Sequence, residues 1–138
     1  MNGLASGVFT GDTLLGVNNT PWVDYSQQST IVGWTSFTNK ILEYVRIGNV
    51  LFVNVYISGT SNSTATSITL PYVAKAVSTS APLVQIQNSG ATFIGGAANI
   101  TVGSNVIIFS RWSSTSVLTS AWTASGTKLI QGQFFYEI

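Results

Sequence analysis

The side chains that could carry acid–base or nucleophilic chemistry are few in this sequence. Its 138 residues include no histidine and no cysteine, and its carboxylates are Asp12, Asp24, Glu43 and Glu137. Glycoside hydrolysis needs a pair of carboxylates, and Asp12 with Asp24 is the one pair close in sequence. Both lie among glycine, asparagine and threonine, where a short carboxylate ordinarily hydrogen-bonds its own backbone in a turn. We therefore expect turns at these positions.

Other catalytic and metal-binding schemes also lack a component. Serine is abundant, but a serine nucleophile needs a base, and neither lysine nor carboxylate stands at a recognisable motif spacing. Zinc prefers histidine or cysteine, and calcium prefers clustered oxygens with more than one carboxylate. The stretch Ser125-Gly126-Thr127-Lys128 lacks the upstream glycine and the Gly-Lys order of a phosphate-binding loop, so it predicts a turn before the last strand. We expect no enzyme activity, no metal and no cofactor.

The composition favours contacts between proteins over charge-driven binding. Hydrophobic residues make up 45% of the chain and charged residues only 7%, against roughly 25% charged in an average soluble domain. A net charge of +1 gives no long-range attraction to nucleic acid or to an anionic membrane. The apolar runs are too short for a membrane-spanning helix, which needs about 18 residues. Because surfaces buried between subunits are depleted in charge, the sequence predicts a homo-oligomer.

The elements that would position any site are strands, since no window keeps the three- and four-residue spacing of a helix. Residues 50–58 alternate apolar and mixed positions, and Gly48-Asn49 predicts a tight hairpin with residues 41–47. The chain ends in a second alternating strand, whose expected inward residues are Ile130, Phe134, Tyr136 and Ile138. Gly103-Ser104-Asn105 predicts another hairpin within residues 99–110. Shorter candidate strands cover residues 67–70, 83–87, 92–94, 100–102 and 106–110.

This spacing predicts one all-β, antiparallel β-sandwich domain over residues 34–138. Residues 1–33 show no sustained alternation, so we expect an extended N-terminal arm that ends near Gly33. Trp22, Tyr25 and Trp34 are large aromatics in or beside this arm, and we expect them to pack it onto the sandwich.

Several phrases of the sequence carry a resemblance to a known class of domain. They are Thr-Pro-Trp-Val-Asp-Tyr at 20–25, Gly-Trp-Thr-Ser-Phe-Thr at 33–38, Tyr-Val-Arg-Ile-Gly-Asn-Val at 44–50, and Ile-Ser-Gly-Thr-Ser-Asn-Ser at 57–63 running on to Ile-Thr-Leu-Pro at 68–71. With the closing Gly126-Thr127-Lys128 and the aromatic strand at 131–136, they resemble a β-sandwich virion domain found in tail fibres, head fibres and capsid decoration proteins of tailed bacteriophages. The resemblance covers about residues 20–138.

The resemblance implies a jelly-roll-like module, usually trimeric, that holds the particle together or recognises a host surface, and it implies no catalytic residues. The short arm before the matching region favours a capsid decoration, or cement, protein. Such an arm could order along a capsid lattice, with the major capsid protein or other virion proteins as partners. The expected location is the virion, assembled in the host cytoplasm. The docking residues that we predict are Leu4, Val8, Phe9, Leu14 and Leu15.

Two other interpretations stay open. In a tail-fibre or receptor-binding tip, Trp112 and Trp122 would flank a serine- and threonine-rich loop at 110–120 and stack on a host surface glycan. The same rings could instead anchor that loop, which we favour. A sugar-binding lectin unconnected to phage fits the composition but not the phrases.

Overall fold

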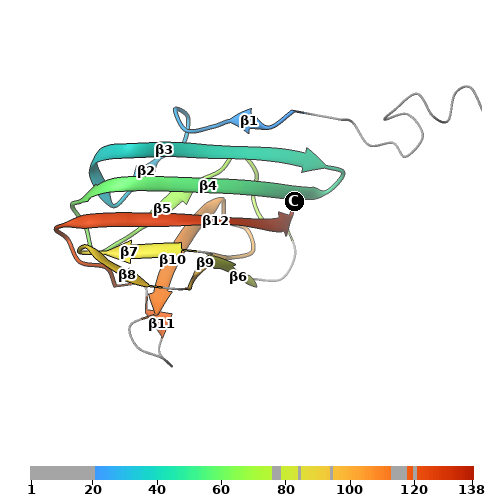
Figure 1. The fold of residues 1–138 in the computed structure, drawn as a ribbon. Helices are drawn as coiled ribbons and strands as arrows, with labels where there is room; N and C mark the ends of the chain where they lie inside the picture. The colour runs from blue at the N-terminus through green and yellow to red at the C-terminus, as the bar shows by residue number, and fades with distance from the viewer. Residues whose placement is uncertain (1–20, 76–78, 84, 94, 113–117, 120) are drawn as a thin grey trace, which may run out of the picture.

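The computed structural model describes residues 21–75, 79–83, 85–93, 95–112, 118–119 and 121–138 (Figure 1). All regular elements in these ranges are β-strands. Their bounds are β1 (Val23–Asp24), β2 (Ile31–Val32), β3 (Trp34–Ile47), β4 (Val50–Ser61), β5 (Ser67–Thr69), β6 (Thr79–Leu83), β7 (Gln85–Asn88), β8 (Ala91–Phe93), β9 (Gly96–Ile100), β10 (Val106–Trp112), β11 (Leu118–Thr119) and β12 (Thr127–Glu137).

The strands form two sheets that pack face to face (Figure 1). The β4–β12 sheet has the order β1-β3-β4-β12-β7-β8, and the β5–β10 sheet has the order β2-β5-β10-β9-β6 with β11 paired to β10. The chain changes sheet on each side of β2, between β4 and β5, between β6 and β7 and between β8 and β9, and the last strand returns to pair with β4. The predicted all-β antiparallel sandwich is confirmed.

The predicted central hairpin is also present. β3 and β4 pair from Ile47↔Val50 onward around Gly48-Asn49, and Gly48 has the positive φ of 58° that a tight turn needs. β12 lies against the other edge of β4, with Phe134 opposite Val53. Alternation then sends one set of side chains into the core, all with zero exposure in β4: Leu51, Val53, Val55 and Ile57.

The core lies between the two sheets. β12 contributes Ile130, Phe134 and Tyr136 to it, and Ile138 packs against it half-buried, as the alternation predicted. The opposite sheet contributes Ile68, Ile100, Ile107 and Phe109, and Leu70, directly after β5, joins them. Phe109 and Phe134 meet edge to face across the interior with ring centroids 6.4 Å apart, a favourable aromatic geometry.

β3 is longer than predicted, since it begins at Trp34 and not near residue 41. Its first half shifts register twice against β4, between Trp34 and Ser36 and between Phe37 and Asn39. These irregularities are β-bulges, which interrupt the period-two pattern and so hide a strand from sequence. Gly59 lies opposite them, where a Cβ atom would collide with the backbone of Ser36. Only glycine fits this close approach.

Two shorter predictions were displaced. The candidate strand at 83–87 is divided, because β6 ends at Leu83 and β7 begins at Gln85 in the other sheet. The candidate at 100–102 lies earlier, as β9 (Gly96–Ile100). β9 is made largely of glycine and alanine, which carry little strand propensity, and its neighbours in the sheet supply the pairing instead.

Residues 21–33 connect the edges of the two sheets. β1 pairs with β3 through Val23↔Tyr44, and β2 pairs with β5 through Ile31↔Ile68. A turn between them has the amide N–H groups of Gln28 and Ser29 donating to the carbonyl of Tyr25. The described part of the expected arm therefore carries short edge strands. The division of the chain at Gly33 stays a prediction.

Candidate functional site

The predicted arm residues fall into two groups. The docking residues lie outside the described part of the chain: Leu4, Val8, Phe9, Leu14 and Leu15. Trp22 is 47% exposed, whereas Tyr25 is half-buried with its ring edge to face against Tyr44. Trp34 is buried, and its indole N–H donates to the carbonyl oxygen of Lys128 over 3.1 Å. The structure does not bring these three aromatics together, and their role in packing an arm stays a prediction.

The two tryptophans of the predicted receptor loop are separated. Trp112 ends β10 with 38% of its surface exposed. Trp122 is only 3% exposed, and its indole N–H donates to the carbonyl of Phe109 over 2.9 Å. Its backbone N–H donates to the carbonyl of Thr64, which ties the segment to the sandwich. The burial of Trp122 agrees with the anchoring role favoured from sequence, and it leaves only the ring of Trp112 exposed for the receptor interpretation.

The carboxylates do not converge on a catalytic arrangement. Asp24 accepts a hydrogen bond from the backbone N–H of Ser26 over 2.8 Å, so the turn expected there is confirmed. Hydrogen bonds from Ser26 hold the pKa of Asp24 below its ordinary value. Asp12 lies outside the described residues, within which no group of three or more potential metal-ligating side chains occurs. The same part of the chain contains no helix long and apolar enough to cross a membrane.

The most unusual polar group is the ammonium of Lys128, which is fully buried near the start of β12. Its Nζ donates to the carbonyl of Ser63 over 2.8 Å and to Oγ1 of Thr66 over 2.9 Å, and lies 3.4 Å from the carbonyl of Ala65. Nζ also lies 5.3 Å from the ring centroid of Trp34 and 5.4 Å from that of Trp122. We call this arrangement the lysine cage.

The lysine cage holds a cation with neutral groups. Carbonyl and hydroxyl oxygens accept hydrogen bonds from its N–H groups, and the negative faces of two indole rings lie within cation–π distance. Burial disfavours the charged form and lowers the pKa of Lys128 to about 8. The cage joins β12 to the segment between β4 and β5, so it closes one end of the sandwich from inside.

Sequence reasoning missed the cage because Lys128 was assigned to a turn. The strand alternation that places Ile130 and Phe134 inward also places residue 128 inward, and this was the available signal. Gly33 adds to the cage, since a Cβ atom there would lie 2.9 Å from the carbonyl oxygen of Ala65 and 3.0 Å from Nζ of Lys128. Gly33 also has φ of 120°, a conformation that other residues adopt only with strain.

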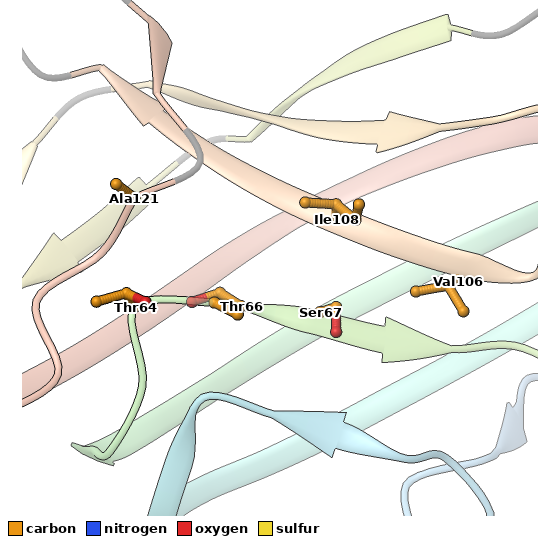
Figure 2. Close-up of a pocket in the computed structure, with 7 residues that line it drawn as sticks. Thr64, Thr66, Ser67, Val106, Ile108 and Ala121 are labelled. Atoms are coloured by element: carbon orange, nitrogen blue, oxygen red, sulfur yellow. The ribbon is translucent and has the colours of Figure 1, made fainter.

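A shallow trough lies outside the cage, on the β5–β10 sheet (Figure 2). Its volume is about 470 Å³, and its lining is uncharged: Thr64, Ala65, Thr66, Ser67, Val106, Ile108 and Ala121. A lining without charge suits a neutral partner surface better than an ionic ligand.

The outer face of the β4–β12 sheet is the second exposed apolar surface. Phe135 is 63% exposed there and stacks at a tilt on Phe52, with ring centroids 5.6 Å apart. Trp22 joins these two rings around a groove of about 190 Å³. Ile41 and Ile47 of β3 are each 41% exposed. We call this surface the aromatic face.

Comparisons with models of protein families, with curated proteins and with solved structures each found no match. The bacteriophage resemblance therefore stays a prediction from sequence. The described residues form a sandwich with few charges, closed at one end by the lysine cage, and apolar side chains are exposed on both of its outer faces.

Proposed function

We propose that this chain is a non-enzymatic structural protein of a bacteriophage virion, working as a capsid decoration protein that docks on the head as a homo-oligomer. The sequence phrases at 20–25, 33–38, 44–50 and 57–71 support the virion assignment by resemblance. The major capsid protein is the proposed docking partner.

One structural observation carries the proposal furthest, namely that apolar side chains stand exposed on both outer faces of the sandwich. Phe135 and Trp22 lie on one face, and Ile108, 45% exposed, lies on the other. Contiguous apolar surface with few charges marks sites of protein–protein contact. A protein with two such faces can contact a neighbouring copy and a lattice at once, which is what a decoration layer requires.

The alternative is a tail-fibre or receptor-binding tip that contacts a host surface glycan. The exposed ring of Trp112 favours it, because an indole at the end of a strand can stack on a sugar face. Trp122 gives this alternative no support, since its ring is buried and its indole N–H donates a hydrogen bond to the carbonyl of Phe109.

The test is to locate the protein on particles. An antibody raised against the purified chain would be applied with gold-conjugated secondary antibody to particles purified from the host lysate, and pre-immune serum would serve as control. We expect gold over the head. Gold at the tail tip would favour the receptor-binding alternative, and particles without gold would refute a place on the virion.

A further inference from the structure

We propose that the aromatic face is the surface through which this chain binds a second copy of itself. The inference deepens the proposed function, because it rests on the homo-oligomer proposed there and gives that oligomer a surface. The face lies on the outside of the β4–β12 sheet, opposite the core (Figure 1).

Cross-strand register orders the face into rows. Phe135 is opposite Phe52, and Phe52 is opposite Val45, which makes an apolar row across β12, β4 and β3. The next row is polar, with Gln133 opposite Asn54 and Asn54 opposite Glu43. A third row returns to larger side chains, with Tyr56 between Gln131 and Ile41. The face is therefore striped, with apolar rows beside a row of amides.

Such stripes suit an identical partner. Apolar rows exclude water when they meet, and amides both donate and accept hydrogen bonds, so one amide row can pair with another. A carboxylate row would repel its own copy. The charged residues of these rows and of the neighbouring Ile47–Val50–Glu137 row lie at the margins: Glu43 with Asp24 beside it on the edge strand β1, and Glu137 at the end of its own row. Glu43 already accepts a hydrogen bond from Asn54 over 3.3 Å.

The sheet is also large enough. It has six strands, and its central strands β3, β4 and β12 contain 14, 12 and 11 residues. β1, β7 and β8 add only 2, 4 and 3 residues at its margins. At the usual strand spacing and rise, each residue covers about 16 Å² of the face, so the sheet presents roughly 700 Å². The resulting footprint is comparable to the ~800 Å² that each partner contributes to a stable interface.

The groove in this face gives the contact a centre. Trp22, Phe52 and Phe135 surround it, with Gln133 as its polar margin. Interfaces concentrate their binding energy in aromatic side chains that insert into such pockets near the centre. Phe135, the most exposed large apolar side chain described, is placed to enter the groove of a neighbouring copy.

The experiment measures the mass of the full-length chain by light scattering at micromolar concentration for wild type, Phe135→Glu and Ile108→Glu. Ile108→Glu is the matched control, because it places the same charge at an exposed apolar position on the opposite face. We expect an oligomeric wild type, an oligomeric control and at least a tenfold weaker association for Phe135→Glu. Circular dichroism would establish that each variant is folded, and Phe135→Ser replaces Phe135→Glu if the charge prevents folding.

Three results would overturn the inference. The first is a monomeric wild type, and the second is unchanged association in the Phe135 variants. The third is dissociation by Ile108→Glu, which would place the contact on the other sheet. A monomer that nevertheless attaches to phage heads through Phe135 would assign the face to the capsid; the proposed function would then stand while this inference fails. Particles without the protein, combined with a Phe135-dependent oligomer, would give the reverse outcome.

Discussion

β12 buries an ammonium group near its start and exposes a phenyl ring near its end. Lys128 and Phe135 are seven positions apart, roughly 23 Å along an extended strand, and strand alternation points them to opposite faces. The buried charge is fully supplied with partners, and every buried side-chain polar atom among the described residues has a hydrogen-bond partner. The exposed ring instead has half of its surface or more in water.

The difference separates two uses of an unusual side chain. The groups of the lysine cage interact with one another within the chain, where carbonyl groups and indole rings fix the geometry of one end of the sandwich. The apolar side chains of the aromatic face are exposed to water. Such exposure is unfavourable for an isolated chain but allows contact with a partner surface. Substitutions in the cage should therefore change folding stability, and substitutions on the face should change association.

The sharpest form of this comparison uses two adjacent phenylalanines. Phe134 is buried and Phe135 is exposed on the same strand. We expect Phe134→Ala to lower the free energy of unfolding by about 3–5 kcal/mol through cavity formation. Phe135→Ala should change it by less than about 0.5 kcal/mol. Urea unfolding at the lowest practicable protein concentration would keep association from contributing, and similar losses in both variants would contradict the assignment of faces.

The next largest loss in the free energy of unfolding is expected for a substitution in the lysine cage. Lys128→Ala removes the side chain that fills the cage and leaves the Ser63 carbonyl and the Thr66 hydroxyl without their donor. We expect a loss of about 3 kcal/mol in the free energy of unfolding. Lys128→Met is the matched variant, since it keeps most of the volume and removes the buried charge, and it should lose less. Equal losses would show that the whole effect comes from removing the ammonium and that filling the cage contributes nothing further.

A pair of glycines tests the wall of the cage. Gly33→Ala adds strain from the positive φ and a contact with Ala65 and Lys128, whereas Gly48→Ala has a positive φ but open space around its Cβ. We expect the Gly48 variant to lose about 1 kcal/mol and the Gly33 variant about 2–3 kcal/mol. Thermal or urea unfolding would measure both. A Gly33 loss no greater than the Gly48 loss would mean that the cage can relax around a methyl group.

The smallest expected effect is a dependence of stability on pH. Burial lowers the pKa of Lys128 to about 8 from its ordinary 10.5, so between these values the unfolded chain binds more protons than the folded one. Stability should then rise with pH, by about 1–2 kcal/mol between pH 8 and pH 10. Lys128→Met should flatten the rise in a urea titration, and an equal rise in that variant would assign the effect to another group.

The upper limit of that titration is set by Tyr136. Burial raises the pKa of its phenol far above the ordinary 10, so above pH 10 the unfolded chain loses a tyrosine proton that the folded chain keeps. Stability should fall there. Burial raises the pKa of Tyr44 in the same direction. The rise between pH 8 and about pH 9, before unfolded tyrosines lose protons, therefore reports mainly on the lysine.

Sequence predicted those parts of the fold whose signal is local. Alternation in residues 50–58 and in the last strand identified the two central strands, and Gly48-Asn49 identified their hairpin turn. Local patterns could not predict that residues 83 and 85 would belong to different sheets, because that assignment depends on long-range pairing. The first half of β3 was missed for a different reason, because its register shifts interrupt the period-two pattern.

The candidate site was less predictable than the fold. Trp122 stands in a serine- and threonine-rich stretch that indicates an exposed loop, yet bonds from its backbone to Thr64 and from its indole to Phe109 turn it inward. Lys128 follows a glycine turn, and a lysine is ordinarily assigned to the surface. In both cases the partners that bury the side chain come from segments that sequence does not place beside it, so the contacts that fix each residue could not be predicted.

The bulges of β3 have a final consequence for how the chain avoids uncontrolled polymerisation. Among the described residues, β1 and the following Tyr25 cover this strand at residues 42–44, and the bulged stretch from Trp34 to Asn39 lies at the sheet edge beside Lys40. Irregular hydrogen-bond spacing and an edge lysine are features that oppose the addition of a foreign strand. At this edge, the backbone geometry therefore disfavours amyloid-like stacking of chains, while the exposed apolar side chains of the sheet faces remain available for contact. An assembly built through contacts between faces in a closed symmetry would stop at a fixed number of subunits.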